Sequence, residues 1–87
     1  MANKTYIFHT DGGHGWLAVK RKELEALNIL DKITCASYQK GGTVYLEEDC
    51  DAGTFMDAKG IKTFKELGCK ESYRDLSPIR NYQPFSK

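Results

Sequence analysis

The sequence predicts a small, single α+β domain, in which two β-hairpins form an antiparallel sheet and two short helices cover one of its faces. Three observations predict this fold. Two pairs of β-rich runs each flank a glycine-rich turn. A stretch of helix-forming residues follows each pair, so the expected order is ββαββα. The chain has 87 residues, the size of one domain, which we divide into a core of residues 1–67 and a C-terminal arm of residues 68–87.

The first hairpin is expected near the N-terminus. Residues 4–9 are rich in β-branched and aromatic side chains and indicate a strand, and residues 16–19 form a second apolar run. Between them, Asp11-Gly12-Gly13 indicates a tight turn, because glycine adopts a positive φ at no steric cost. The two runs therefore pair around a glycine-rich loop.

A short helix is expected directly after this hairpin. Residues 21–28 are good helix formers up to Asn28, and Leu24 and Leu27 lie on one helical face. Asn28 is suited to the left-handed backbone that ends a helix. A helix of this length depends on packing for its stability.

The second hairpin is the clearest pattern in the chain. Residues 32–38 and 43–47 are rich in strand-forming side chains, and Gly41-Gly42 lies between them. Alternation along the two strands places the following pairs on common faces: Ile33 with Cys35, and Val44 with Leu46.

The second helix is expected to begin near Asp49 and Asp51, whose carboxylates can cap free backbone amides. Gly60 is placed to end it. Residues 61–67 fit either a fifth strand or a loop, and no firm period follows. The side chains that share one face of this helix are Ala52, Phe55, Met56 and Lys59.

Charge and cysteine content exclude some classes of function. With 13 Lys+Arg against 12 Asp+Glu, the net charge of +1 argues against a protein that coats nucleic acid and against an acidic DNA mimic. No apolar run approaches the roughly 20 residues that span a bilayer, and no signal peptide is evident. Cys35, Cys50 and Cys69 cannot all pair within one chain. We therefore expect a protein with reduced thiols in a bacterial cytoplasm, without membrane contact.

The first candidate site is the loop of the first hairpin. Residues 9–16 hold both histidines, three glycines and the only tryptophan. Glycines let a backbone approach a ligand closely, and histidine binds ligands or carries protons near neutral pH. Asp11, His14 and Trp16 are therefore candidate binding residues. The alternative is a tight hairpin whose glycines serve the turn and whose Trp16 belongs to the core.

A zinc site is the second candidate. His9 and His14 can supply ligands together with Cys50, or with Cys35 and Cys69, although no Cys-x-x-Cys motif is present. Cys50 lies among four carboxylates, which raise the pKa of a thiol and make it a poor nucleophile. The alternative for this acidic segment is helix capping on a solvated surface. We therefore expect no cofactor, with zinc as the open alternative.

The third candidate is the C-terminal arm. It combines the residue types that dominate binding hot spots, and its two prolines limit the freedom lost on docking. Three alternatives stay open: contact with a protein, stacking on single-stranded nucleic acid, and an arm that folds back on the sheet or frays. The candidate binding residues are Tyr73, Arg74, Arg80 and Tyr82.

Three segments resemble a group of small proteins found in phages and mobile genetic elements. These are residues 8–17 (FHTDGGHGWL), 37–39 (SYQ) and 45–52 (YLEEDCDA). Asn28 stands where that group usually has glycine after the first helix. The resemblance implies a genetic setting rather than a mechanism. By analogy, small phage proteins without an enzyme signature often bind host or defence proteins, and some inhibit CRISPR nucleases.

These observations favour a non-enzymatic binding protein, monomeric or homodimeric, that occupies a host or defence protein, as an anti-CRISPR inhibitor would. One alternative is a small metal-binding or histidine-dependent enzyme that uses His9, His14 and Cys50. The other is a nucleic-acid-binding accessory protein that uses the arginines and tyrosines of the arm together with the lysines.

Overall fold

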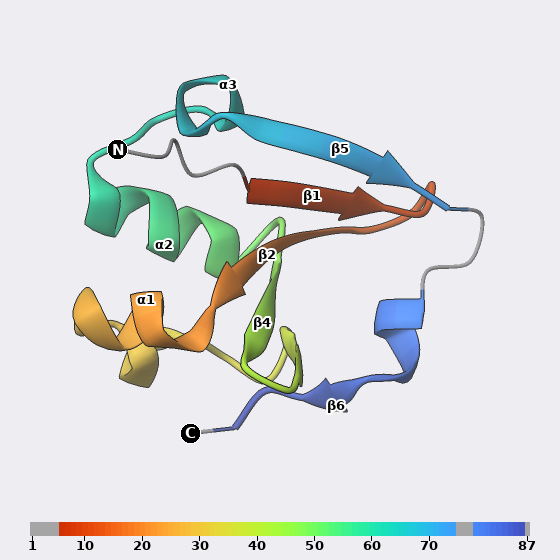
Figure 1. The fold of residues 1–87 in the computed structure, drawn as a ribbon, viewed down its shortest axis with the longest axis horizontal. Coiled ribbons are helices and arrows are strands. Elements are labelled where there is room, and N and C mark those ends of the chain that lie inside the picture. The colour runs from red at the N-terminus through yellow and green to blue at the C-terminus, as the bar shows by residue number, and fades with distance from the viewer. Residues whose placement is uncertain (1–5, 75–77, 87) are drawn as a thin grey trace.

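The computed structural model describes residues 6–74 and 78–86, and its centre is a twisted sheet of six strands (Figure 1). The strands are β1 (Tyr6–Thr10), β2 (Gly15–Lys20), β3 (Tyr38–Lys40), β4 (Thr43–Glu47), β5 (Cys69–Tyr73) and β6 (Gln83–Pro84). The helices are α1 (Arg21–Ala26), α2 (Asp51–Lys59) and α3 (Phe64–Leu67), with 3-10 turns η1 (Leu30–Lys32) and η2 (Pro78–Asn81). Among the described residues, none of these helices has the length and apolar character to cross a membrane.

The spatial order of the strands is β5-β1-β2-β4-β3-β6. All neighbours run antiparallel except β1 and β5, which are parallel and lie side by side in Figure 1. The predicted α+β class is confirmed. β1 pairs with β2 as predicted, and β3 pairs with β4 only over Tyr38–Lys40. The segment after residue 67, which we expected to form an arm, contributes β5 and β6, and these are the two edge strands.

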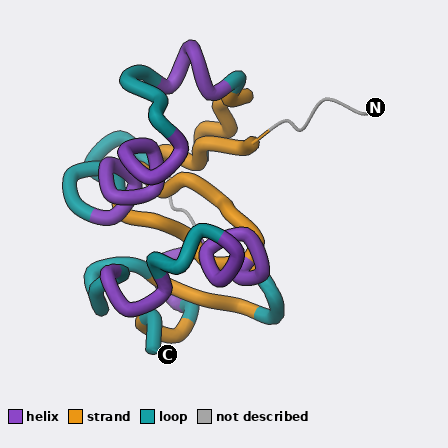
Figure 2. Tube along the Cα trace, turned by 90° about the vertical axis from the view of Figure 1, so that its left-hand side faces the viewer, coloured by secondary structure: helices purple, strands orange, loops and turns teal. Residues whose placement is uncertain are grey.

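The hydrophobic core lies between the sheet and the helices α1 and α2. Leu17, Leu24, Leu46 and Phe55 are completely buried there, and the ring of Tyr6 lies 5.6 Å from that of Phe55. Figure 2 views the molecule from the side of these helices and shows them in front of the strands. The alternation predicted for β4 is therefore correct, because Val44 and Leu46 both face this core.

Polar contacts tie the first strand to both helices. The hydroxyl of Tyr6 donates a hydrogen bond of 2.6 Å to the Glu23 carboxylate, and the Lys59 ammonium lies 3.0 Å from the same oxygen. Burial raises the pKa of Tyr6, and Glu23 raises it further, so this phenol stays protonated. Hydrogen bonds to a charged group contribute about 1.5–3 kcal/mol each when shielded from water.

The residues that end α1 and α2 at their C-termini were predicted correctly. Asn28 has a φ of 59° just after α1, and Gly60 has a φ of 73° just after α2. The backbone N–H of Ile61 donates to the carbonyl of Met56, which satisfies one of the free carbonyls of the last turn.

The strand predicted over residues 32–38 is wrong for most of its length, because β3 begins only at Tyr38. The Asp51 carboxylate, with 1% of the residue exposed, holds the preceding segment in a loop. It accepts hydrogen bonds from the Thr34 amide (3.0 Å), the Thr34 hydroxyl (2.9 Å) and the Ser37 hydroxyl (2.5 Å). Ile33 is buried and Cys35 is exposed, so they do not share a face.

The predicted capping by Asp49 and Asp51 is also wrong. Cys50 is the N-cap of α2 and no side chain caps it, because Asp51 is occupied by the loop. Asp49 is exposed, and its amide donates to the Glu47 carboxylate.

The fifth strand that residues 61–67 allowed is replaced by α3. The hydroxyl of Thr63 accepts a hydrogen bond of 3.1 Å from the Glu66 amide, and the Glu66 carboxylate accepts one of 2.9 Å from the Lys62 amide. Thr-x-x-Glu is a sequence signature of a helix start, so this short helix carried a signal in the sequence.

Candidate binding site on the open face of the sheet

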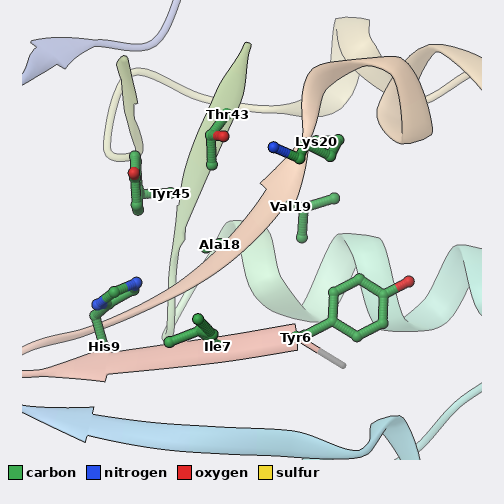
Figure 3. Close-up of a pocket in the computed structure, with 8 residues that line it drawn as sticks. All are labelled: Tyr6, Ile7, His9, Ala18, Val19, Lys20, Thr43 and Tyr45. Atoms are coloured by element: carbon green, nitrogen blue, oxygen red, sulfur yellow. The ribbon is translucent and has the colours of Figure 1, made fainter. Parts of the chain in front are cut away.

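The face of the sheet opposite the helices, here called the open face, carries a different set of side chains. Alternation along β1, β2 and β4 turns every second residue toward it. Figure 3 shows these side chains in front of the strands and α2 behind them. The residues concerned are Ile7 and His9, Ala18 and Lys20, and Thr43 and Tyr45.

A hollow of about 400 Å³ lies on this open face (Figure 3). Ala18 pairs with Ile7 on one side and with Tyr45 on the other. Its methyl group is much smaller than both neighbours, so it forms the floor of the hollow between two taller walls. Lys20 and Thr43 are opposite each other at one end. The volume lies within the usual range of ligand sites, about 300–1,000 Å³.

Aromatic rings form one wall of the hollow and continue beyond it. The rings of His9 and Tyr45 are 5.7 Å apart and meet edge to face, and Tyr82 lies 5.2 Å beyond Tyr45. The Lys40 ammonium lies 4.8 Å from the centre of the Tyr82 ring. Three half-buried rings and a cation thus form a row across the sheet.

The titratable groups of this wall are neutral at pH 7. Burial lowers the pKa of His9, and the nearby Arg74 charge lowers it further. Burial raises the pKa of Tyr45, and the adjacent Tyr82 adds to that effect. The wall therefore offers uncharged ring faces, an imidazole and a phenol hydroxyl to a ligand.

The hairpin loop serves mainly to shape the turn. The Asp11 carboxylate accepts hydrogen bonds from the amides of Gly13 (3.4 Å) and His14 (3.1 Å), which is the local bonding of an Asx turn. Asp11 is 8% exposed. Gly15 lets Phe8 pack, since a Cβ there would come within 2.6 Å of the Phe8 ring. Asp11 therefore acts as a turn residue in this structure.

Trp16 lies at the open face but is covered by its neighbours. It is 2% exposed, and its ring lies 6.2 Å from Tyr38 and 5.9 Å from His14, which stacks on it. Trp16 is thus a packing residue, as the alternative interpretation of the loop expected. Of the two candidate binding residues His14 and Trp16, only His14 is exposed and therefore accessible to a partner.

The structure does not assemble the expected zinc ligands. Within residues 6–74 and 78–86, no group of three His, Cys, Asp or Glu side chains is placed to hold a metal ion. His9 packs on Tyr45 and His14 on Trp16, whereas Cys50 is exposed at the start of α2. Desolvation and then the Glu47 carboxylate raise the pKa of the Cys50 thiol, so it is not an activated nucleophile.

The candidate residues near the C-terminus separate onto different surfaces. Tyr73 is 61% exposed and pairs with Thr10, which places it on the helix side of the sheet. Arg74 is exposed beside His9, and Tyr82 joins the aromatic row. The side chain of Arg80 lies outside the described residues.

Sequence reasoning missed most of the hollow. Strand alternation predicts the core-facing residues of β4, and the same alternation predicts that Thr43 and Tyr45 face away from the core. The aromatic ring of Tyr45, at a position that faces away from the core, is the sequence signal that could have indicated a binding surface. The missed residues are Ile7, Ala18, Lys20, Lys40, Thr43 and Tyr45.

In comparisons with known proteins, no protein-family model, curated protein or solved structure matches the chain.

Proposed function

We propose that this protein is a non-catalytic binding protein whose partner docks on the open face of the sheet. The observation that carries the proposal is the apolar and aromatic surface around the hollow, where Ile7 is 42% exposed beside the half-buried rings of His9 and Tyr45. A concave hollow lined by apolar and aromatic side chains with a few polar groups is typical of binding sites, and tyrosine is enriched among the residues that dominate binding energy.

The size of the molecule is consistent with this role. A standard interface covers about 800 Å² on each partner. The described chain exposes 5662 Å², so such a partner would cover roughly a seventh of its surface. The open face belongs to a hydrogen-bonded sheet whose other face packs on the core. Its backbone therefore needs little reordering when a partner binds, which lowers the entropic cost of binding.

A host or defence protein as the partner stays a prediction that rests on the resemblance to phage proteins. The enzyme alternative finds less support, because His9 and His14 pack on separate rings and Cys50 lies apart from both.

Site-specific photo-crosslinking tests the proposed surface without knowledge of the partner. A photoreactive phenylalanine analogue replaces Ile7 on the open face, and in a matched control it replaces Ala26, which is exposed on α1. After irradiation of cells that produce the protein, we expect a discrete crosslinked species from position 7 and none from position 26. Equal crosslinking from both positions, or none from position 7 in folded protein, would overturn the proposal.

A further inference from the structure

We infer that the partner on the open face is a single-stranded nucleic acid, with bases stacked on the aromatic row and phosphates held by the cations around it. This inference rests on the proposed function and specifies the chemistry of the partner. Three features of the open face support the inference: the row of rings, the hollow beside it and a border of cations.

The cations of the open face form a border around the hollow. Lys20 and Lys40 pair with the same residue, Thr43, from opposite sides. Lys70 pairs with Ile7 on the far side, and the charge of Arg74 acts on His9. All four are exposed. They come from β2, β3, β5 and the residue that follows β5, so only the folded sheet brings them around one surface.

These four cations differ from two cations on the helix side, Arg21 and Lys59. Arg21 forms an ion pair with Glu25 and Lys59 forms one with Glu23. Across residues 6–74 and 78–86, by contrast, no ion pair involves the cations that border the hollow. The whole chain carries a net charge of only +1, whereas on the open face of the described strands these four cations face one carboxylate, that of Glu47, which pairs with Trp16. Such a surface is complementary to a chain of phosphates.

The aromatic row would contact the bases of the nucleic acid, whereas the cations would contact its phosphates. Single-stranded nucleic acids bind where a basic groove follows the backbone and aromatic side chains stack with successive bases. Tyr82 and Tyr45 lie 5.2 Å apart, and the floor at Ala18 leaves space beside Tyr45 for a flat ring. The neutral His9 and the hydroxyl of Thr43 can both donate to and accept from base edges.

The rings also decide between nucleic acid and the other acidic partners. A duplex keeps its bases stacked inside and presents mainly phosphates and groove edges, so the hollow would contact no base face. An acidic peptide offers carboxylates to the lysines but no π-faces to Tyr45 and Tyr82. A single-stranded nucleic acid offers both phosphates to the lysines and exposed base faces to the tyrosines.

Fluorescence anisotropy with labelled 12-nucleotide oligo-dT and oligo-U tests the inference. We expect binding at 50 mM NaCl that weakens with added salt. A log–log slope near −3 corresponds to four phosphate contacts at about −0.7 each for a single strand. The same length of duplex is expected to bind more weakly.

Matched variants assign the binding to the open face. Tyr45→Leu and Tyr82→Leu should each weaken binding roughly tenfold, within the range known for base stacking. Tyr73→Leu, an exposed tyrosine on the helix side, should not. Lys20→Gln and Lys40→Gln should each reduce the magnitude of the salt slope by about 0.7, whereas Lys32→Gln on η1 should leave it unchanged. Circular dichroism establishes that each variant is folded.

Three outcomes would overturn the inference. One is the absence of oligonucleotide binding at 50 mM NaCl, and another is an equal loss in Tyr45→Leu and Tyr73→Leu. The third is a poly-glutamate peptide that binds more tightly than either oligonucleotide through the same residues. If the Ile7 crosslink to a protein persists in these cases, the proposed function stands and only the class of partner is wrong. If that crosslink is missing too, both fail.

Discussion

The two faces of the sheet are made by the same strands and differ in almost every physical property. In β4, Val44 and Leu46 are buried against the helices, while Thr43 and Tyr45 between and beside them are half-buried on the open face. Aliphatic side chains fill the covered face, and aromatic rings bordered by cations occupy the other. The difference teaches that a period of two residues lets one short strand supply both a core and a binding surface.

Substitutions at two consecutive residues of β4 test that division most directly. Leu46→Ala should reduce the free energy of unfolding by about 2–5 kcal/mol, because Leu46 is completely buried and its loss leaves a cavity. Tyr45→Leu should cost less than about 1.5 kcal/mol, since the leucine keeps much of the packing. Urea denaturation measures both. Similar losses at the two positions would mean that the open face contributes to stability as the core does.

Removal of the buried carboxylate should have the next largest effect. Asp51→Ala should destabilise the protein by about 3 kcal/mol, because the buried Ser37 hydroxyl and the partly buried donors of Thr34 lose their acceptor. The exposed Asp49→Ala should stay within about 0.5 kcal/mol of the parent. A small effect of Asp51→Ala in urea denaturation would show that the loop does not depend on this carboxylate.

Two glycines sharpen the comparison between crowded and open positions. Gly15→Ala should destabilise by about 1–3 kcal/mol, because the added Cβ would meet the Phe8 ring at 2.6 Å. Gly53→Ala should stabilise by about 0.5–1 kcal/mol, because Gly53 lies within α2 with no neighbour within 4 Å of an added Cβ. Thermal unfolding followed by circular dichroism measures the two opposite shifts, and shifts of the same sign would contradict this account.

The smallest expected effect is a pH dependence from the open face. The pKa of His9 is lowered in the folded state, by burial and then by Arg74, so the unfolded state binds a proton more readily. The stability contributed by neutral His9 is complete above its ordinary pKa of about 6.5 and is lost as the pH falls through the folded value.

Unfolding measured from pH 7.5 to 5 checks this dependence. We expect His9→Gln to flatten the decline toward acid, whereas His14→Gln, which removes the exposed histidine of the loop, should keep it. If the decline in His9→Gln equals that of the parent protein, another group is responsible.

Part of the candidate site could be read from the sequence and part could not. The sequence indicates Tyr82 and Arg74 as binding residues by type, and His9 as a candidate ligand or proton carrier at the hairpin loop. The floor at Ala18 and the cations Lys20 and Lys40 were not, because an alanine or lysine in a strand is unremarkable until its neighbours are known. Tyr73 has the same residue type as Tyr82 but lies on the other side of the sheet.

The sequence by itself determined the features that depend on neighbouring residues: the two glycine turns, the left-handed stops at Asn28 and Gly60, and the alternation that buries Val44 and Leu46. Tertiary structure alone decided the loop held by Asp51 and the parallel pairing of β5 with β1. It also decided the contact of Tyr82 with Tyr45. The physical reason is the range of the forces involved. Turn and helix-end preferences arise within a few residues, whereas a buried carboxylate or an edge strand is stabilised by partners that only the folded chain brings close.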